Sequence, residues 1–238
     1  LRSSVMNEDM ISSAELSRAA CCNLGESFVT NPSVDVSYSD AATGAKQIKL
    51  LGLSGTYVQM LTENIPNYRG AAAPYGLGYV PGPWMQSIQV SKGTSSVKNG
   101  YEAITGQINV EFKKPQLPEA DWVSANLFAS TTNRYEANAD ATLKLSKRWS
   151  TSLLAHYENE TKAHDGNDDG FVDIPQVEQY NVWNRWAYMG DHYVFQAGIK
   201  ALSETRTSGQ ANHGGTMHSG DLYKVCLLYT SDAADDLI

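Results

Sequence analysis

The chain has 238 residues, 42% of them hydrophobic, and a formal net charge of −8 at pH 7, so it can form one large domain or two ordinary ones. This acidic balance argues against a nucleic-acid-binding protein, because such proteins use a basic surface to displace phosphate counterions. The longest apolar runs fall short of about 18 residues, which excludes a transmembrane helix but leaves alternating barrel strands open.

The first predicted element is an amphipathic helix over residues 13–28. Ser12 and Glu15 have the spacing of a capping box, and Asn31-Pro32 ends the helix. Apolar residues recur every four positions, as expected for one buried helical face. They are Leu16, Ala20, Leu24 and Phe28.

Three short strands are predicted next, with a turn at Gly52 to Gly55 between the second and the third. Their alternating apolar residues are Val34, Val36 and Tyr38, then Ile48 and Leu50, then Val58 and Met60. A helix followed by strands in this order predicts an α+β domain.

Residues 68–83, YRGAAAPYGLGYVPGP, are predicted to form an irregular loop, because they are rich in Gly, Pro, Ala and Tyr and have no periodicity. Gly76 and Gly78 match only part of a dinucleotide-binding fingerprint, and no helix is predicted to follow them. Nucleotide binding is therefore not favoured.

The segment 88–115, IQVSKGTSSVKNGYEAITGQINVEFKKP, is predicted to be a strand, a turn and a returning strand. Gly93, Gly100 and Gly106 separate the two alternating runs, at points where the chain turns tightly or passes close to another backbone. After this segment the sequence changes from mixed helix and strand patterns to repeated two-residue alternation. We therefore interpret the segment as the junction between two unlike domains.

From Trp122 onward, five segments alternate strictly between apolar and polar residues. They are 123–129, 134–145, 149–157, 180–188 with one interruption at Asn184, and 193–201. Their length suits a tilted crossing of a bilayer, although a soluble antiparallel sandwich would alternate in the same way. Charged residues such as Arg134, Glu136 and Lys144 on the polar face favour a water-filled lumen.

The predicted connections alternate in length. Ser146 to Arg148 and Gly190-Asp191 are short, whereas Thr161 to Glu178 and the segment from Ser203 are long. Bacterial barrels keep short turns on the periplasmic side and long loops outside, which assigns the two ends of the strands.

The long loop from Thr161 to Glu178 has an acidic pattern that resembles the first half of a calcium-binding loop. Oxygen-bearing side chains at alternate positions converge on a hard cation. The candidate ligands are Asp165, Asn167, Asp169 and Asp173, with Glu178 as an additional one. The alternative is an acidic loop that is simply solvated. In the following Gly-rich segment, His213, Met217 and His218 offer further metal ligands, but their spacing matches no zinc pattern.

The junction resembles the end of the plug domain of TonB-dependent outer-membrane receptors. Members of this family have the pattern I-x-V-x-K/R-G-x-x-S-x-x-x-G-x-x-A-x-x-G-x-I-N. Its positions correspond here to Ile88, Val90, Lys92, Gly93, Ser96, Gly100, Ala103, Gly106, Ile108 and Asn109. Residues 49–55 and 60–66 resemble two earlier plug motifs, with departures: Leu51 stands in place of an arginine, and Thr62 to Asn64 replace an Asp-Gly turn. Because Leu51 has no charge, the resemblance does not imply that this chain makes the charge contacts that the arginine usually makes in the barrel lumen.

The resemblance implies an α+β plug domain, residues 1–115, followed by antiparallel transmembrane β-barrel strands, residues 116–225, with about five strands present of a barrel of about 22. Residues 226–238 break the alternation and resemble an appended sequencing-adapter tail, so we exclude them from the predicted fold. The start at Leu1, without Met or a signal peptide, suggests a fragment.

By the same resemblance, the protein would be a transporter in the bacterial outer membrane, surrounded by its lipid, and not an enzyme. Its ligand would be an extracellular metal chelate such as a siderophore, haem or cobalamin. The plug apex would contact the ligand through Tyr68, Arg69, Tyr75 and Tyr79. The TonB complex of the inner membrane would act on a segment before Leu1, which could also carry a signalling domain. No cofactor beyond calcium is implied, and the alternative function is a secreted calcium-binding β-sandwich that binds a glycan or peptide.

Overall fold

The computed structural model describes residues 7–18, 23–28, 31–32, 34–40, 43–53, 55–69, 73–93, 103–115, 122–210 and 224–237. The chain divides into two compact units. The first comprises Leu1–Asp40 and Ala45–Lys113, and the second comprises Ala41–Gly44 and Lys114–Ile238. Among the described residues, no helix is both long and apolar enough to cross a membrane.

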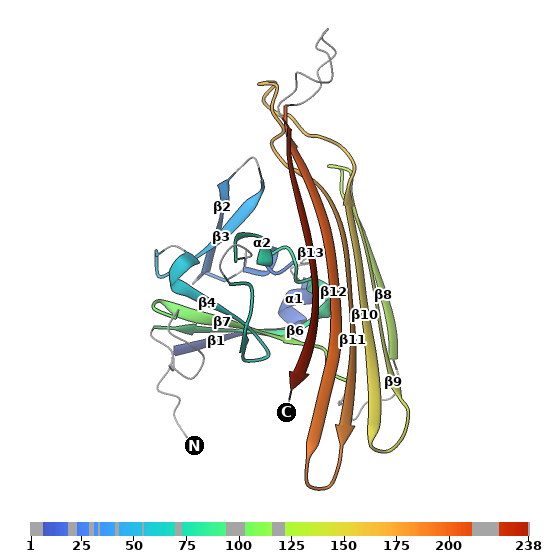
Figure 1. The fold of residues 1–238 in the computed structure, drawn as a ribbon. Coiled ribbons are helices and arrows are strands. Elements are labelled where there is room, and N and C mark those ends of the chain that lie inside the picture. The colour runs from blue at the N-terminus through green and yellow to red at the C-terminus, as the bar shows by residue number, and fades with distance from the viewer. Residues whose placement is uncertain are drawn as a thin grey trace. The chain divides into compact units, whose positions relative to one another are not determined.

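The first unit is built around a five-stranded sheet of order β1-β6-β7-β4-β5 (Figure 1). Its strands are β1 (Asn7–Ser12), β4 (Val58–Thr62), β5 (Ile65–Pro66), β6 (Met85–Lys92) and β7 (Gly106–Phe112). Only β4 and β7 run parallel, and the other pairs are antiparallel. Trp84, Ile88, Ile108 and Phe112 are almost fully buried, with Trp84 and Phe112 packed edge to face at 6.4 Å. They form the core of this unit.

A separate two-stranded sheet pairs β2 (Val34–Asp40) with β3 (Ala45–Leu50). After it the chain makes a tight turn in which Leu50 and Leu53 exchange two backbone hydrogen bonds of 3.2 Å. The residues at the turn, Leu51 and Gly52, have φ angles of 55° and 80°. The predicted strands and turn are confirmed, and Leu51 proves to occupy a left-handed conformation.

The predicted helix over 13–28 is confirmed at its start and wrong at residues 23–28, while residues 19–22 lie outside the described residues. Helix α1 covers Ser13–Arg18, and Glu15 Oε2 accepts hydrogen bonds from both the backbone and the hydroxyl of Ser12. The backbone bond is the half of a capping box that the glutamate supplies. Residues 26–28 form instead a 3₁₀ turn, η1 (Glu26–Phe28), and Asn23 makes an isolated β-bridge with Pro81. Leu24 and Phe28 are buried as predicted, but they lie in a turn and not in a helix. Two backbone hydrogen bonds hold this turn in place: the N–H of Leu24 donates to Val80, and the N–H of Gly25 donates to Leu77.

The junction forms β6 and β7 as predicted, and its motif residues have identifiable structural roles. A Cβ on Gly106 would lie 2.2 Å from the backbone oxygen of Ser91, so only glycine fits at this crossing of β6 and β7. Gly93 has a φ of 92°, and Lys92 makes an ion pair of 2.8 Å with Asp9 on β1. Gly100 lies outside the described residues.

Asn109 explains how the chain replaces the usual Asp-Gly turn of the plug. Its Oδ1 accepts the backbone N–H of Asn64 at 2.8 Å, and its Nδ2 donates to Glu111 at 2.9 Å. Glu63 and Asn64 both have positive φ, 50° and 66°, as in a two-residue primed hairpin turn between β4 and β5. The buried Asn109 side chain therefore fixes a turn that contains no glycine.

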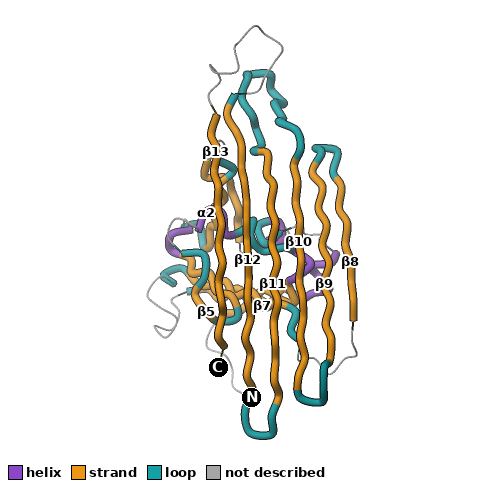
Figure 2. The backbone as a smooth tube through the Cα atoms, turned by 45° about the vertical axis from the view of Figure 1, so that its right-hand side comes forward, coloured by secondary structure: helices purple, strands orange, loops and turns teal. Residues whose placement is uncertain are grey.

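The second unit is an antiparallel six-stranded sheet of order β13-β12-β11-β10-β9-β8, whose strands lie side by side in Figure 2. The bounds are β8 (Trp122–Ala129), β9 (Arg134–Lys144), β10 (Trp149–Glu160), β11 (Gln176–Met189), β12 (Val194–Gly209) and β13 (Lys224–Leu237). The five predicted strands are confirmed, and β11 and β12 extend beyond the predicted loop boundaries at Glu178 and Ser203. The described strands of the second unit lie in one sheet rather than in two packed sheets, so the sandwich alternative is not supported.

Strand β13 falls on residues that the sequence analysis excluded from the fold. Its backbone pairs with β12 from Gln196↔Leu237 to Gly209↔Lys224. An edge strand offers unpaired backbone groups to any extended segment, whatever its side chains, so this pairing does not depend on the sequence of 226–238. The origin of these residues as an appended tail stays a prediction.

One face of this sheet is apolar and exposed to solvent. Large side chains on it keep from 41% to 82% of their surface accessible, among them Val123, Leu127, Leu153, Trp186 and Ile199. On the opposite face, the polar residues Glu136, Asp140 and Arg185 are each at most 4% exposed. A continuous apolar surface of this extent requires a covering phase, and hydrocarbon on that side is the physical solution for barrel strands.

Candidate functional site

The four aromatic and basic residues predicted to contact a ligand lie in and around one loop of the first unit, but they differ in accessibility. Arg69 is exposed, and Tyr68 and Tyr75 are half-buried. Tyr79 has 0% of its surface exposed. A ligand arriving from solvent can therefore touch Tyr68, Arg69 and Tyr75, whereas Tyr79 supports the loop from within.

Tyr68 is held in an unusual conformation. Its φ is 53°, a region that non-glycine residues seldom occupy, and its backbone N–H donates to Asn67 Oδ1 at 2.8 Å. The Tyr79 ring lies 6.1 Å away, and a Cβ on Gly76 would come within 2.5 Å of Tyr68 Cβ. Gly76 is thus required for Tyr68 to fit. The surrounding contacts hold Tyr68 in its strained backbone conformation, and strained residues of this kind are often found at ligand-binding positions.

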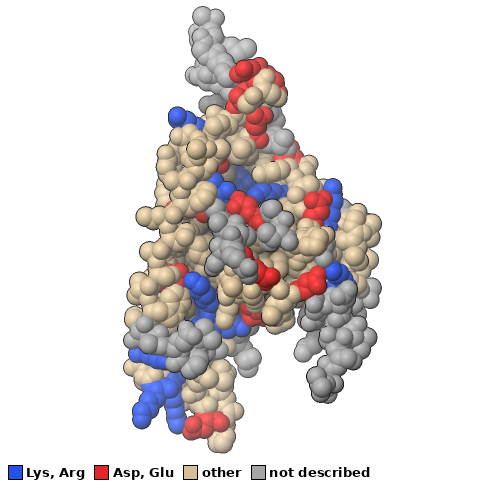
Figure 3. All heavy atoms as spheres, turned by 180° about the vertical axis from the view of Figure 1, so that it is seen from behind, with Lys and Arg blue, Asp and Glu red and all other residues tan. Residues whose placement is uncertain are grey.

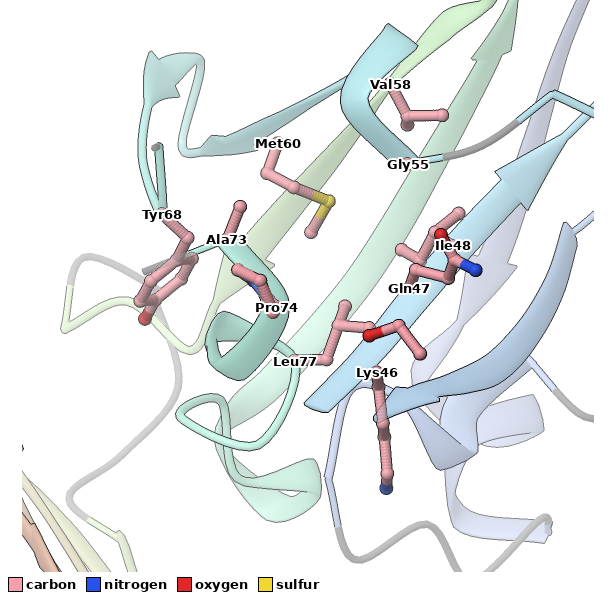
Figure 4. A pocket seen from close by; sticks show the side chains of 11 residues that line it. Lys46, Gln47, Ile48, Gly55, Val58, Met60, Tyr68, Ala73, Pro74 and Leu77 are labelled. Carbon is pink, nitrogen blue, oxygen red and sulfur yellow. The ribbon is translucent and has the colours of Figure 1, made fainter. Parts of the chain in front are cut away.

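Tyr68 also forms one wall of a cavity of about 210 Å³ inside the first unit (Figure 4). In this view Tyr68 and Pro74 lie on one side, Ile48 and Gln47 on the other, and the Met60 thioether lies between them. The lining comes from β2, β3, β4, η2 (Gly55–Tyr57) and the segment around α2 (Ala73–Gly76). The lining residues are Ser39, Lys46, Gln47, Ile48, Gly55, Val58, Met60, Tyr68, Ala73, Pro74 and Leu77.

The chemistry of this cavity is mainly apolar. Ile48, Val58 and Leu77 supply branched aliphatic surface, and Met60 supplies a flexible and polarisable thioether. The Ser39 hydroxyl is already used, since it donates to the backbone oxygen of Ala45 at 3.1 Å. At this size the cavity suits one ring or a short aliphatic arm, because sites for whole drug-sized ligands begin at about 300 Å³.

The predicted calcium loop is compact, but its carboxylates face backbone groups. Asp165 accepts the N–H groups of Asp169 and Gly170 at 3.2 and 2.8 Å, and Asp173 accepts that of Gly166 at 2.7 Å. Asn167 Nδ2 donates to Asp169 at 3.0 Å. Within the described part of the chain, no group of three or more His, Cys, Asp or Glu side chains is arranged to hold a metal ion.

Glu178, the additional candidate ligand, is not part of this loop. It lies on β11 and accepts a hydrogen bond of 2.8 Å from the Tyr180 hydroxyl. His213, Met217 and His218 lie outside the described residues.

The polar face of the sheet carries a charged network that the sequence analysis did not identify. Arg134 binds Glu136 at 2.6 Å and Glu158 at 2.9 Å, and Glu158 lies in one cross-strand row with Glu136 and Gln179. Gln179 extends the row to β12 by donating to Glu204 at 2.6 Å. The alternation placed these residues on the polar face, but their contacts depend on strand register, which alternation alone does not fix.

The first unit matches a family model. Residues 1–107 match the TonB-dependent Receptor Plug Domain. No curated protein matches the chain in sequence.

Solved structures match most of the chain. The pyoverdine outer membrane receptor FpvA from Pseudomonas aeruginosa PAO1, bound to pyoverdine, has a TM-score of 0.70 and 15% identity over 88% of this chain and 29% of its own. The alcaligin outer membrane receptor FauA from Bordetella pertussis has a TM-score of 0.68 and 12% identity, covering 88% of this chain and 35% of its own.

The ferric yersiniabactin uptake receptor FyuA from Yersinia pestis has a TM-score of 0.66 and 15% identity over 86% of this chain and 32% of its own. At these identities the likeness establishes the fold, and the chain spans about a third of the length of these receptors. Residues 1–107 are therefore a TonB-dependent receptor plug domain, and the chain as a whole has the fold of such a plug joined to barrel strands, as in these outer-membrane receptors.

Proposed function

We propose that the protein takes part in the energised uptake of a metal chelate across the outer membrane, and that a siderophore is its ligand. The observation that supports this most is the joining of a plug domain to strands with one apolar and one charged face. Such strands suit a water-filled barrel in which a plug controls passage. The TonB complex of the inner membrane would supply the energy.

The preference for a siderophore over haem or cobalamin is supported by the solved receptors that share the fold. The three named above are receptors for pyoverdine, alcaligin and ferric yersiniabactin. The apical loop adds a chemical argument, since Tyr68, Tyr75 and Arg69 offer aromatic surfaces and a cation to a chelate that carries rings or acidic groups.

In this proposal Tyr68 has the main role in binding. It is accessible from solvent, it is held in a strained conformation, and it borders the cavity next to Met60. One arm of the chelate would enter the cavity while Arg69 and Tyr75 contact the rest of the ligand. Tyr79 would not contact the ligand, because it is fully buried.

Growth experiments test the transport function. A strain that lacks the gene, complemented with the full-length gene, is grown with single siderophores, haem or cobalamin as the limiting nutrient. We expect complementation to restore growth on at least one siderophore and to leave growth on haem and cobalamin unchanged. Restoration on haem or cobalamin alone would disprove the siderophore assignment, and restoration on none would disprove uptake of these chelates.

The role of Tyr68 is tested in the same strain. Tyr68→Ala should raise the siderophore concentration needed for half-maximal growth by at least tenfold, which corresponds to about 1.4 kcal/mol of lost binding. Tyr57→Ala is the matched control, because Tyr57 is also a half-exposed tyrosine of the first unit but does not border the cavity. Equal effects of the two variants would contradict a binding role for Tyr68.

We further propose that the loop 165–173 binds calcium. The support is the alternation of oxygen-bearing residues within one compact loop, although a bound ion would have to draw Asp165 and Asp173 away from backbone N–H groups. Calorimetric titration of calcium into the chain should give heat that is lost in Asp165→Asn/Asp169→Asn. Asp168→Asn, which removes one charge from the same loop outside the alternating set, should retain it. No calcium heat from the unchanged chain would refute the proposal.

A further inference from the structure

One end of the six-stranded sheet carries an ordered row of aromatic side chains on its apolar face. Trp149, Tyr188 and Phe195 are directly opposite one another on three neighbouring strands. The rings of Trp149 and Tyr188 lie 5.0 Å apart, and Tyr193 stacks on Tyr188 at 5.5 Å. Aromatic residues with polar edges favour the boundary between hydrocarbon and headgroups.

A second aromatic pair fixes the height of the apolar band. Tyr157 and Tyr180 are cross-strand partners with rings 4.9 Å apart, and along each strand they lie eight residues from Trp149 and Tyr188 respectively. Eight residues span about 27 Å along a strand, or about 20 Å along the membrane normal at the usual barrel tilt. This is close to the apolar band of outer-membrane barrels, so the Trp149 row marks one membrane boundary.

Basic side chains lie immediately beyond this row, in the turn between β9 and β10. Lys147 and Arg148 are both exposed, and Figure 3 shows Lys and Arg side chains gathered beside this turn at the lower end of the molecule. The Ser146 hydroxyl accepts the N–H groups of Arg148 and Trp149 at 3.3 and 3.0 Å, which fixes the turn. Arg148 is also tied to Asp191 of the next short turn at 2.8 Å.

The charge at this end is opposite to that of the other end. The negative charge of Asp191 neutralises the positive charge of Arg148. The charge of Lys147 remains, so the two short turns together have a net positive charge. The long loop between β10 and β11 carries Asp165, Asp168, Asp169 and Asp173 against Lys162 alone. Among the turns and loops that the structure describes, the short-turn end therefore combines an aromatic boundary with an excess of positive charge.

We propose that the β9–β10 and β11–β12 turns bind the headgroup of an anionic phospholipid in the leaflet on the short-turn side. The Lys147 ammonium and the remaining N–H donors of Arg148 would contact the phosphate, since both are suited to phosphate oxygens. Trp149, Tyr188 and Tyr193 would flank the glycerol region. The inference rests on the membrane position of the strands and is independent of which chelate is transported.

Native mass spectrometry of the full chain released from lipid nanodiscs tests this proposal. The nanodiscs contain equal amounts of phosphatidylglycerol and phosphatidylcholine, and the lipids that stay bound are counted. We expect phosphatidylglycerol to be retained about fivefold over phosphatidylcholine, the effect of one basic residue close to an anionic leaflet. Equal retention of the two lipids would overturn the proposal.

Two charge-reversal variants locate the site. Lys147→Glu should abolish the preference, whereas Lys162→Glu, the same change at the acidic end, should keep it. Both lysines are exposed, so neither change disturbs the folded sheet. A preference that survives in Lys147→Glu, or that disappears equally in both variants, would refute the assignment. Excess inorganic phosphate should not displace the lipid, and full displacement would show a phosphate site in place of a lipid site.

Discussion

Asn184 accepts a hydrogen bond from the indole of Trp186, with 2.7 Å between Asn184 Oδ1 and Trp186 Nε1. Both side chains lie on the apolar face of β11, and Asn184 is midway between the boundary residues Tyr180 and Tyr188. Its amide also donates to the backbone oxygen of Ser152 at 3.1 Å. The one interruption in the apolar alternation is therefore satisfied within the sheet, which is how a polar group is accommodated in hydrocarbon.

This pairing predicts a compensating effect between two substitutions. Trp186→Phe or Asn184→Leu alone should lower the free energy of unfolding by about 1 to 3 kcal/mol, because each leaves the other polar group unpaired. The double variant should recover most of this loss. Urea unfolding of the folded chain in detergent measures the coupling as a double-mutant cycle, and additive losses would contradict it. Trp149→Phe, on the same face but remote from Asn184, serves as the control.

Leu51 predicts a gain in stability. It has a φ of 55° and is 62% exposed, so its side chain strains the backbone without burying apolar surface. Leu51→Asn should stabilise the first unit by about 0.5 to 1 kcal/mol, because asparagine tolerates the left-handed region. The nearby Leu53→Asn is the control, since Leu53 is also exposed but has an ordinary φ. A stability gain in both variants, measured by denaturant unfolding, would attribute the effect to polarity instead of strain.

Alanine substitutions at Gly106 and Gly93 should lower the stability of the first unit by different amounts. Gly106→Ala forces a Cβ to within 2.2 Å of Ser91 backbone oxygen and should cost more than about 3 kcal/mol, or prevent the sheet from forming. Gly93→Ala meets no atom within 4 Å and should cost only the conformational penalty of its φ, about 1 to 2 kcal/mol. Limited proteolysis and hydrogen exchange of β6 and β7 report the difference. Equal losses would contradict a steric role for Gly106.

Gly198 predicts a rescue experiment on the polar face. A Cβ there would lie 2.8 Å from Trp183 Nε1, and the Trp183 ring is flanked by Arg185 at 4.5 Å and by Lys200 at 5.9 Å. Gly198→Ala should destabilise the sheet by about 1 to 3 kcal/mol through overpacking. The smaller ring of Trp183→Phe should relieve this clash in the double variant. If the double variant is less stable than Gly198→Ala alone, a clash with Trp183 does not cause the destabilisation by Gly198→Ala.

Much of the fold followed from the sequence because it depends on local patterns. Two-residue alternation fixes which face of a strand a residue occupies, so the apolar and polar faces of β8 to β12 were predictable. The spacing of Lys92, Gly93, Gly106 and Asn109 indicated the plug, and the structure explains two of these positions. Gly106 allows two backbones to meet, and the Asn109 side chain accepts a hydrogen bond from a turn 45 residues away. The helix predicted over 13–28 was wrong at residues 23–28, because contacts of this segment with Val80 and Leu77 override the four-residue periodicity.

What the sequence by itself determined was the class of each segment and the identity of its two faces. What only the tertiary structure decided was which side chains meet. Strand register brings Glu136, Glu158 and Gln179 into one row, and the fold buries Tyr79 while leaving Tyr68 accessible at a cavity wall. The physical reason is that alternation and turn propensity act over a few residues, whereas these contacts join residues from separate elements and are set by the packing of the whole unit.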